Sequence, residues 1–397
     1  MTYVLAVLEI LQLAGAMAIS LFLAVHGLYY LLVLRGDRVR RYAELMKRLS
    51  NEPISYNELP YVSVVMPVYN EEQTISRKLQ EIAQLAYPRE RIEVVLINDC
   101  STDRTVHVAR RILDDLPLRS RILSNVQRMG PNACYNVGVR ESNGDLVFTT
   151  DADVTVSSSA LMKAVSVLLH FEVGGVTAKA VSVPQGEEAA FAIEKSYRGM
   201  FQQMFAAESA IHSTFPGYTA CMVFRRPIFS PMATGYGSSD GNISLMIIRK
   251  RLKFIYVPEM LFYEPISGGF TEQKARKVRR ATRLIQSTLR NRDMFFNGRY
   301  GDFGRLVFPL RFGMMIVCPP ALLLGSICVV LAIMLMSLSL GLLIVSAFSC
   351  IAYLAISGAV DELEFFGAFL AHEFYMLLGL LGSPRRRAVW SKDGKNI

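Results

Sequence analysis

The chain of 397 residues is poor in several residue types that mark particular protein classes: it contains one Trp, five His and six Cys. The cysteines fit neither a zinc site nor the disulfide framework of a small secreted domain, so we expect reduced thiols in a cytoplasmic setting. His107, His170 and His212 also lack the spacing of metal ligands, and we expect them to be structural. Internal repeats and low-complexity segments are lacking as well, which argues against solenoid and fibrous architectures.

Long hydrophobic runs, by contrast, are abundant, and 52% of the residues are hydrophobic. Residues 4–34 form a run longer than the roughly 20 residues that a helix needs to cross a membrane. The run is too long for a signal peptide and does not open with a basic residue. We therefore predict an N-terminal transmembrane helix over residues 1–34.

A second apolar region, residues 312–382, is predicted to hold two or three further transmembrane helices. Its first part is long enough for a helical hairpin that reverses near residues 337–341. The last run, residues 363–382, contains Glu364, His372 and Glu373, and charged groups are costly near the centre of a span. This run therefore either crosses the membrane or lies at its surface, and the side on which the chain ends stays open.

The basic excess of the chain, a formal net charge of +9, is concentrated next to the apolar runs. Residues 35–60 are predicted to be a basic juxtamembrane linker, and residues 383–397 a basic tail. Because basic residues favour the cytoplasmic side of a membrane, we place the domain after the linker in the cytoplasm, at the plasma membrane. Anionic lipid headgroups account for the positive charge, so no nucleic-acid partner is expected.

Between the apolar regions, predicted strands alternate with predicted helices. Apolar strands are expected at residues 61–66, 92–97, 120–123 and 146–150, with helices between them. This alternation is typical of an α/β fold with a mostly parallel sheet and helices on both faces.

Acidic residues follow two of these strands at the point where each strand ends. Asp99 follows the strand at residues 92–97, and Asp151 and Asp153 follow the strand at residues 146–150. Open α/β sheets bind ligands at this edge. Two carboxylates one residue apart point the same way and are suited to sharing Mg²⁺ or Mn²⁺ with a diphosphate.

Five motifs, in this order, resemble glycosyltransferase family 2, whose members are inverting enzymes with the Rossmann-like GT-A fold. The motifs are Pro67-Val68-Tyr69-Asn70-Glu71, Asn98 to Asp103, Gly130 with Asn136 and Gly138, Asp151-Ala152-Asp153, and Ser238-Ser239-Asp240. The chain is distantly similar to the membrane-anchored enzymes of the hyaluronan, chitin and cellulose synthase type. The resemblance implies a nucleotide-sugar-binding half over residues 61–155 and an acceptor-side half over residues 156–270.

The resemblance also implies a role for each matching residue. Asp240 is the expected catalytic base, Asp153 with Asp151 the expected ligands of Mg²⁺ or Mn²⁺, and Gly217 and Ser239 the expected acceptor-side residues. Residues expected to bind the nucleotide-sugar donor are Pro67, Tyr69, Asn70, Glu71, Asp99, Arg128, Asp151 and Arg279. The expected donor is a UDP-sugar, because the Asp99 carboxylate is suited to accept a hydrogen bond from the imide of uracil. Alternative interpretations are a helix cap for Asp99, a solvated loop for Arg128 and a surface loop for Asp240.

Residues 271–311 are predicted to form basic amphipathic helices at the membrane surface, because residues 274–292 hold eight basic residues and no acid. Arg276, Arg279, Arg280 and Arg283 share one helical face and are suited to bind a diphosphate or a lipid phosphate. Polysaccharide synthases of the family carry a Gln-x-x-Arg-Trp motif here, of which only Arg279 is kept. The missing Trp favours transfer to a lipid-linked or other membrane-proximal acceptor, with membrane lipids as neighbours. A processive polysaccharide synthase and a non-catalytic GT-A membrane subunit are the alternatives.

Overall fold

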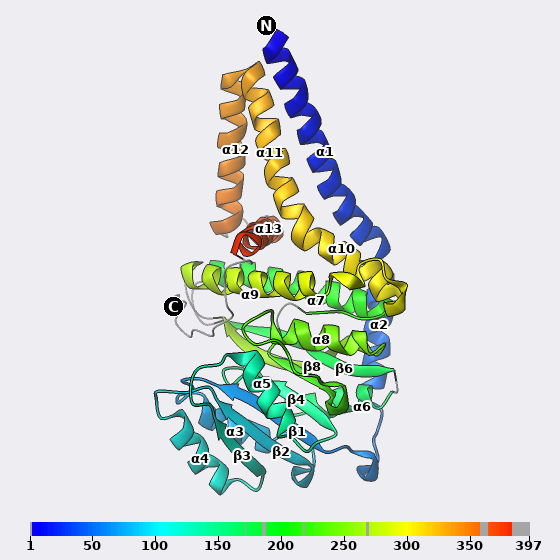
Figure 1. The fold of residues 1–397 in the computed structure, drawn as a ribbon, viewed down its shortest axis with the longest axis vertical. Helices are drawn as coiled ribbons and strands as arrows, with labels where there is room; N and C mark the ends of the chain where they lie inside the picture. The colour runs from blue at the N-terminus through cyan, green and yellow to red at the C-terminus, as the bar shows by residue number, and fades with distance from the viewer. Residues whose placement is uncertain are drawn as a thin grey trace.

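The computed structural model describes residues 2–170, 172–184, 188–216, 219–266, 270–357 and 364–382. Figure 1 shows a sheet-based domain at one end and a group of long helices at the other, with α7 and α9 lying between the two parts. The sheet-based domain and α9 hold the predicted site residues that the structure describes.

The domain is built on one sheet of eight strands in the order β3-β2-β1-β4-β7-β6-β8-β5. The strands are β1 (Val62–Val68), β2 (Ile92–Asn98), β3 (Arg119–Ser124), β4 (Leu146–Thr150), β5 (Thr155–Val156), β6 (Val173–Pro184), β7 (Cys221–Arg225) and β8 (Lys253–Ile266). β3, β2, β1 and β4 are parallel, as the sequence predicted, and β6 is parallel to β8. β7 runs antiparallel to both β4 and β6, and short β5 runs antiparallel to β8.

Helices cover both faces of the sheet. They are α3 (Ile75–Ala83), α4 (Thr105–Asp115), α5 (Pro131–Arg140), α6 (Ala160–Leu168), α7 (Glu188–Ile211), α8 (Ser239–Arg249) and α9 (Phe270–Arg290). Alternate residues of a strand point to opposite faces. Val64 and Met66 of β1 therefore pack in one core with α3, α4, α6 and α7, and Val65 packs in a second core with α5, α8 and α9.

The register of the sheet sets the predicted motifs at one edge. Val68 of β1 pairs with Asn98 of β2, so the loop after β1 lies beside Asp99. Val65 of β1 pairs with Thr149 of β4, and the same register continued by two residues sets Asp151 level with Pro67. The carboxyl ends of β1, β2 and β4 therefore form the candidate site.

The remaining helices lie outside the sheet-based domain. They are α1 (Thr2–Leu32), α2 (Gly36–Leu49), α10 (Phe308–Phe312), α11 (Cys318–Met336), α12 (Leu338–Ser357) and α13 (Glu364–Gly382). π-helical turns at Phe303–Val307 and Gly313–Val317 join α10 and α11 into one long helix. Short 3-10 turns occur at Tyr56–Glu58, Arg89–Arg91, Arg226–Ile228, Arg292–Met294 and Gly298–Tyr300.

Two helices, Tyr3–Leu32 and Phe303–Met336, are long and apolar enough to cross a membrane by length and composition. Large apolar side chains on α1 and α11, such as Leu13 and Leu324, are exposed, as on a lipid-facing surface. α12 turns back from α11 at Ser337, where the hairpin was predicted to reverse.

Three segments near these helices differ in detail from the sequence interpretation. The predicted linker contains the amphipathic helix α2, which docks on the domain through a hydrogen bond from the Tyr42 hydroxyl to the carbonyl of Tyr256 (2.6 Å). The second long apolar helix begins at Phe303 rather than at residue 312, so it takes in the end of the predicted interfacial segment. α13 packs on α9 and α7 and is seen end-on in Figure 1, across the direction of α1, α11 and α12.

Candidate active site

The acid pair, Asp151 and Asp153, lies just after the end of β4. The backbone N–H of Asp151 donates to the carbonyl of Ala220 (3.1 Å), which anchors the start of the loop to the chain leading into β7. Asp151 is half-buried. Asp153 has surface that solvent reaches, but nearby protein atoms reduce the hydration of its carboxylate. Burial raises the pKa of Asp151 well above its usual range, and the charges of Asp153 and Glu264 raise it further. Burial and Glu264 also raise the pKa of Asp153.

Asp240, the predicted base, lies in the first turn of α8 and is buried. Its Oδ2 accepts from the backbone N–H of Thr219 (2.9 Å) and its Oδ1 from that of Gly241 (2.8 Å). Burial raises the pKa of Asp240, and these hydrogen bonds together with the Arg280 charge offset part of the rise. Thr219 and Ala220 are adjacent, so Asp240 and the start of the acid-pair loop are fixed to neighbouring residues of one segment.

The loop that leads to Asp240 is held from two sides. On one side, Asn132 of α5 donates to the carbonyls of Ala233 (3.0 Å) and Tyr236 (2.9 Å). On the other, Gln286 of α9 accepts from the backbone N–H of Gly237 (3.0 Å). Ser238 caps α8, and Ser239, a predicted acceptor-side residue, is half-buried at the start of that helix. Helices from different parts of the chain thus position the predicted base.

The predicted donor loop after β1 is tied to the loop after β2. Asn70 has a positive φ of 54°, a conformation that Asn tolerates better than most residues. Its backbone N–H donates to Ser101 (3.0 Å), and its side-chain oxygen accepts from the backbone N–H of Thr102 (2.9 Å). Glu71 is buried, and its carboxylate accepts from Thr74 (2.5 Å). Pro67 is the buried penultimate residue of β1.

Asp99 and Arg128, two further predicted donor-binding residues, meet through the loop before α5. The fully buried carboxylate of Asp99 accepts from the backbone N–H groups of Met129 (2.8 Å) and Gly130 (2.9 Å) and from the Asn125 amide (2.9 Å). The guanidinium of Arg128 lies 3.6 Å from the ring centroid of Tyr69. The structure therefore brings Tyr69, Asp99 and Arg128 together, while their contact with a nucleobase stays a prediction.

α9 brings Arg280 to the acid cluster. Arg280 donates to Glu264 of β8 (3.4 Å), and its charge lowers the pKa of Asp151, Asp153 and Asp240. For Arg279, the predicted donor-binding residue, burial and then the charges of the other arginines lower the pKa to about 10.

Sequence analysis missed Glu264 and Tyr135. Glu264 lies within the long strand β8, outside any motif. Tyr135 of α5 is buried, and its pKa is raised well above its usual range by burial and then by Asp151 and Asp240. Gly217, the other predicted acceptor-side residue, lies outside the described residues.

The acid pair fits a divalent cation whose coordination is completed by its ligand. Among the described residues, no group of three or more His, Cys, Asp or Glu is placed to hold a metal ion. Two hard carboxylates one residue apart, of which Asp153 raises the pKa of Asp151, nevertheless favour a cation. Mg²⁺-type ions often bind one or two carboxylates plus substrate phosphates. Asp151 and Asp153 would hold such an ion, leaving positions for the oxygens of a diphosphate.

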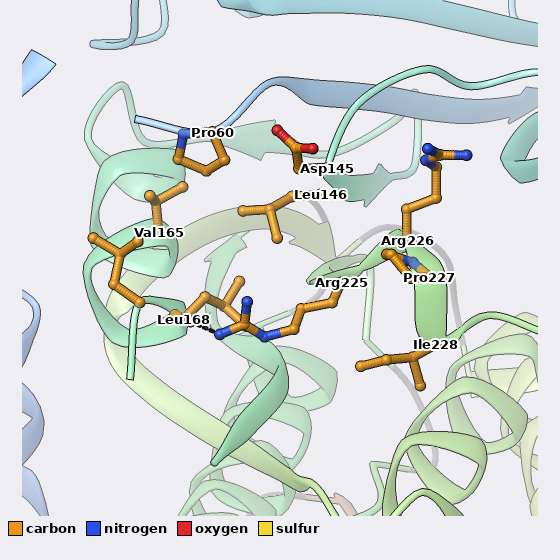
Figure 2. Close-up of a pocket in the computed structure, with 10 residues that line it drawn as sticks. Pro60, Asp145, Leu146, Val165, Leu168, Arg225, Arg226, Pro227 and Ile228 are labelled. Carbon is orange, nitrogen blue, oxygen red and sulfur yellow. Dashed lines mark hydrogen bonds between the residues drawn. The ribbon is translucent and has the colours of Figure 1, made fainter. Parts of the chain in front are cut away.

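A well-formed pocket lies elsewhere, at the opposite end of β4. Figure 2 shows this cavity of about 240 Å³, with Leu146, the first residue of β4, in its wall and Arg225 turned toward Leu168. Its lining is mostly apolar, and Arg225 donates to the carbonyls of Leu168 and Val173. None of the predicted site residues lines it, so it is separate from the candidate active site.

Comparisons with known proteins agree with this geometry. The family described as glycosyl transferase family 2 matches residues 63–231. A probable glycosyltransferase of Bacillus subtilis is 30% identical over 150 residues, which is 37% of this chain and 36% of that protein. A dodecaprenyl-phosphate galacturonate synthase of Rhizobium johnstonii is 33% identical over 109 residues, 27% of this chain and 31% of that protein. The chain thus spans about a third of the length of these curated relatives.

A solved structure matches nearly the whole fold. A mannosyltransferase from Pyrobaculum calidifontis, solved with GDP-mannose and Mn²⁺, superposes with a TM-score of 0.72 at 22% identity. The match covers 94% of this chain and 99% of that one, so the apolar helices are included in the shared architecture. The chain thus shares its fold with that mannosyltransferase, and its residues 63–231 match glycosyltransferase family 2.

Proposed function

We propose that the protein is a membrane-bound, inverting glycosyltransferase that moves a sugar from a UDP-sugar to a hydroxyl of a lipid-linked acceptor at the cytoplasmic face of the plasma membrane. The observation that carries the proposal is that the start of the acid-pair loop and Asp240 are fixed to two adjacent residues. The backbone N–H of Asp151 donates to the carbonyl of Ala220, and the Asp240 carboxylate accepts from the backbone N–H of Thr219. A leaving-group site and a base on one short segment are what a single displacement requires.

The donor half of the site is formed by the loops after β1, β2 and β4. Tyr69, Asp99 and Arg128 are grouped where the nucleoside would lie, and the acid pair lies where the diphosphate would lie. A bound Mg²⁺ or Mn²⁺ would neutralise the charge that develops on the leaving diphosphate. The mannosyltransferase of the same fold was solved with Mn²⁺ and a nucleotide sugar, which supports this assignment.

Asp240 would take the proton from the attacking hydroxyl. Its carboxylate is fixed by two backbone N–H groups, so its orientation is set before substrates bind. Burial raises its pKa, which makes the carboxylate a stronger base than an exposed Asp. Attack from the side opposite the diphosphate would invert the anomeric carbon.

The membrane side supports a lipid-linked acceptor. α9, whose arginines face the acid cluster, lies between the sheet and the apolar helices (Figure 1). One relative is named for a dodecaprenyl-phosphate product. An acceptor held in the membrane would therefore reach Asp240 along α9.

The test uses the full chain in detergent, with UDP- and GDP-sugars screened by thermal stabilisation with and without Mn²⁺. A ligand that binds only the native protein raises its unfolding temperature. We expect stabilisation by one UDP-sugar in the presence of Mn²⁺ and its loss in Asp153→Ala. Stabilisation by GDP-sugars alone would overturn the donor assignment, and metal-independent binding would overturn the cation site.

Transfer is then measured with a lipid-linked glycan and labelled donor. Asp240→Asn is expected to bind donor normally and to lose transfer at least a hundredfold, the lower range for loss of a general base. Undiminished transfer in this variant would remove Asp240 from the mechanism, because a hydroxyl acceptor loses a proton as it attacks and another group would have to take it. A ladder of long products would instead indicate a processive synthase.

A further inference from the structure

Glu264 joins the acid cluster to two arginines. Its Oε2 accepts from Arg198 of α7 (2.8 Å), and its Oε1 accepts from Arg280 of α9 (3.4 Å). Only 17% of the Glu264 side chain is exposed. Burial acts to raise the pKa of Glu264, but Arg198 and Arg280 outweigh it and hold the pKa below its usual range. β8 pairs its Tyr263 with Thr155 of β5, so Glu264 follows a residue paired two positions after Asp153 and adds a third negative charge near the acid pair.

Arg198 is itself immobilised by a second carboxylate. Glu194, one turn earlier on α7, accepts from Arg198 (2.9 Å) and pairs with Lys277 of α9 (2.7 Å). The side chains of Glu194 and Arg198 are each 5% exposed. Lys277 also lies over the rings of Tyr197 (4.4 Å) and Tyr375 (5.4 Å), so α13 contributes to the anchor. Glu264 is thus held between Arg198 of α7, which is anchored by Glu194, and Arg280 of α9.

Arg280 also interacts electrostatically with carboxylates other than that of Glu264. Its positive charge acts on Asp151, Asp153 and Asp240 as well, lowering the pKa of each against the effect of burial. Binding of a donor diphosphate with its cation would change this arrangement. The cation would replace Arg280 as the partner of the acids, and the diphosphate would attract Arg280. Arginine is suited to this exchange because its planar guanidinium binds carboxylates and phosphates alike.

We propose that Arg280 is the resident counter-ion of the acid cluster in the donor-free enzyme, kept there by Glu264, and that it passes to the donor diphosphate when cation and donor bind. This inference rests on the proposed function. It makes Arg280 a donor-binding residue and Glu264 a positioning residue that acts through Arg280 and through its own charge.

The proposal predicts effects of opposite sign in one variant. Arg280→Gln removes a positive charge that competes with a cation, so the affinity for Mn²⁺ alone is expected to rise about three- to tenfold, as for one nearby unit charge at a partly solvated site. The same variant loses a phosphate ligand, so the affinity for pyrophosphate at saturating Mn²⁺ is expected to fall about tenfold or more. A loss of packing or folding would weaken both affinities together.

The experiment measures both affinities on the full chain in detergent. Mn²⁺ binding without donor is followed by the loss of the free-ion signal in electron paramagnetic resonance, and pyrophosphate binding by calorimetry. Arg290→Gln, on the exposed last turn of α9, is the control for net charge and is expected to leave both affinities unchanged. Arg280→Lys keeps the charge and is expected to restore the Mn²⁺ affinity of the wild type but only part of the pyrophosphate affinity.

Glu264→Gln tests the other half of the pair. Because it removes a negative charge near the cation site, the affinity for Mn²⁺ alone is expected to fall, opposite to Arg280→Gln. Glu194→Gln removes a more deeply buried carboxylate that pairs with Arg198 and Lys277. It is expected to lower the unfolding temperature while leaving Mn²⁺ affinity near that of the wild type.

The outcomes separate this inference from the proposed function. If the wild type binds no Mn²⁺, or binds it equally after Asp153→Ala, the proposed cation site itself fails. If Mn²⁺ binding depends on Asp153 but is the same in Arg280→Gln and Arg290→Gln, only the counter-ion inference fails. Parallel losses of both affinities in Arg280→Gln would assign Arg280 to structure alone.

Discussion

At the scale of single residues, the proposed role of Asp240 as the base predicts how activity depends on pH. A base must be deprotonated, so activity falls as the pH drops through its pKa. Burial raises this pKa, so the acid limb of kcat, measured at saturating donor and Mn²⁺, is expected above pH 4, the region of an ordinary Asp. Ser238 donates to the carboxylate and lowers its pKa, so Ser238→Ala is expected to move this limb to higher pH.

The control for this shift is Ser142→Ala, which removes a buried hydroxyl bonded to the carbonyl of Val139 (2.7 Å). Ser142→Ala is expected to lose about 1 kcal/mol of stability, and Ser238→Ala about 0.5–2 kcal/mol, because it also removes the N-cap of α8. Only Ser238→Ala is expected to move the acid limb. An unchanged limb in Ser238→Ala would show that another group controls the profile.

At the level of residues, motifs predict positions near a strand end, but they do not predict contacts that depend on distant packing. Asp151, Asp153 and Asp240 were predicted from ordered motifs; the structure fixes Asp151 to Ala220 and Asp240 to Thr219, and the roles of all three stay predictions. Glu264 lies on β8 with nothing beside it in the sequence to mark it, because its neighbours Arg198 and Arg280 come from two other helices. Only the folded chain shows that Arg280 forms an ion pair with Glu264.

At the scale of elements, the parallel half of the sheet follows from the alternation of strands and helices, whereas the second half does not. β7 lies between β4 and β6 and runs antiparallel to both. It pairs with β4 over five residues, and this pairing sets Cys221 opposite Thr150. Local sequence carries no signal for such a distant pairing, yet the pairing places Thr219 and Ala220 against Asp240 and Asp151.

The packing of α5 on the sheet gives a prediction for an element. A Cβ built on Gly138 would lie 2.4 Å from Cγ1 of Val65 and 2.6 Å from Cδ1 of Ile97. Gly138→Ala is therefore expected to destabilise the protein by about 1–3 kcal/mol, as overpacking of a core does. The measurement is the unfolding temperature, together with donor binding, because α5 also carries Asn132 and holds the loop before Asp240.

Gly199 of α7 is the matched control, since a Cβ at that position meets no atom within 4 Å. Gly199→Ala is expected to be neutral or slightly stabilising, because Ala favours a helix over Gly. Equal stability of the two alanine variants would mean that α5 has room to move away from the sheet.

At the scale of the whole molecule, a buried polar cluster joins the apolar helices to the catalytic domain. Glu208 of α7 is fully buried and accepts from Tyr29 of α1 (2.8 Å) and Thr214 (2.6 Å). Arg311 of α10 is 1% exposed and lies 3.5 Å from the same carboxylate. The helices α1, α7 and α10, which are far apart in the sequence, therefore meet at the Glu208 carboxylate. This contact fixes the sheet-based domain to the ends of the long helices.

Removing one member of this ion pair leaves the other charge buried without compensation, which costs about 3–5 kcal/mol. Arg311→Met is therefore expected to lower the unfolding temperature strongly. The double variant Glu208→Gln with Arg311→Met is expected to recover much of the loss, because Gln keeps an acceptor for Tyr29 and Thr214 and no buried charge remains. Arg41→Met, which breaks the exposed pair with Asp37 (2.8 Å), is the control and is expected to change stability by less than about 1 kcal/mol. A double-mutant cycle with the single variants Glu208→Gln and Arg311→Met measures the coupling of the two charges. Additive losses of stability would show that Glu208 and Arg311 act independently. A double variant more stable than Arg311→Met would confirm that their charges are coupled.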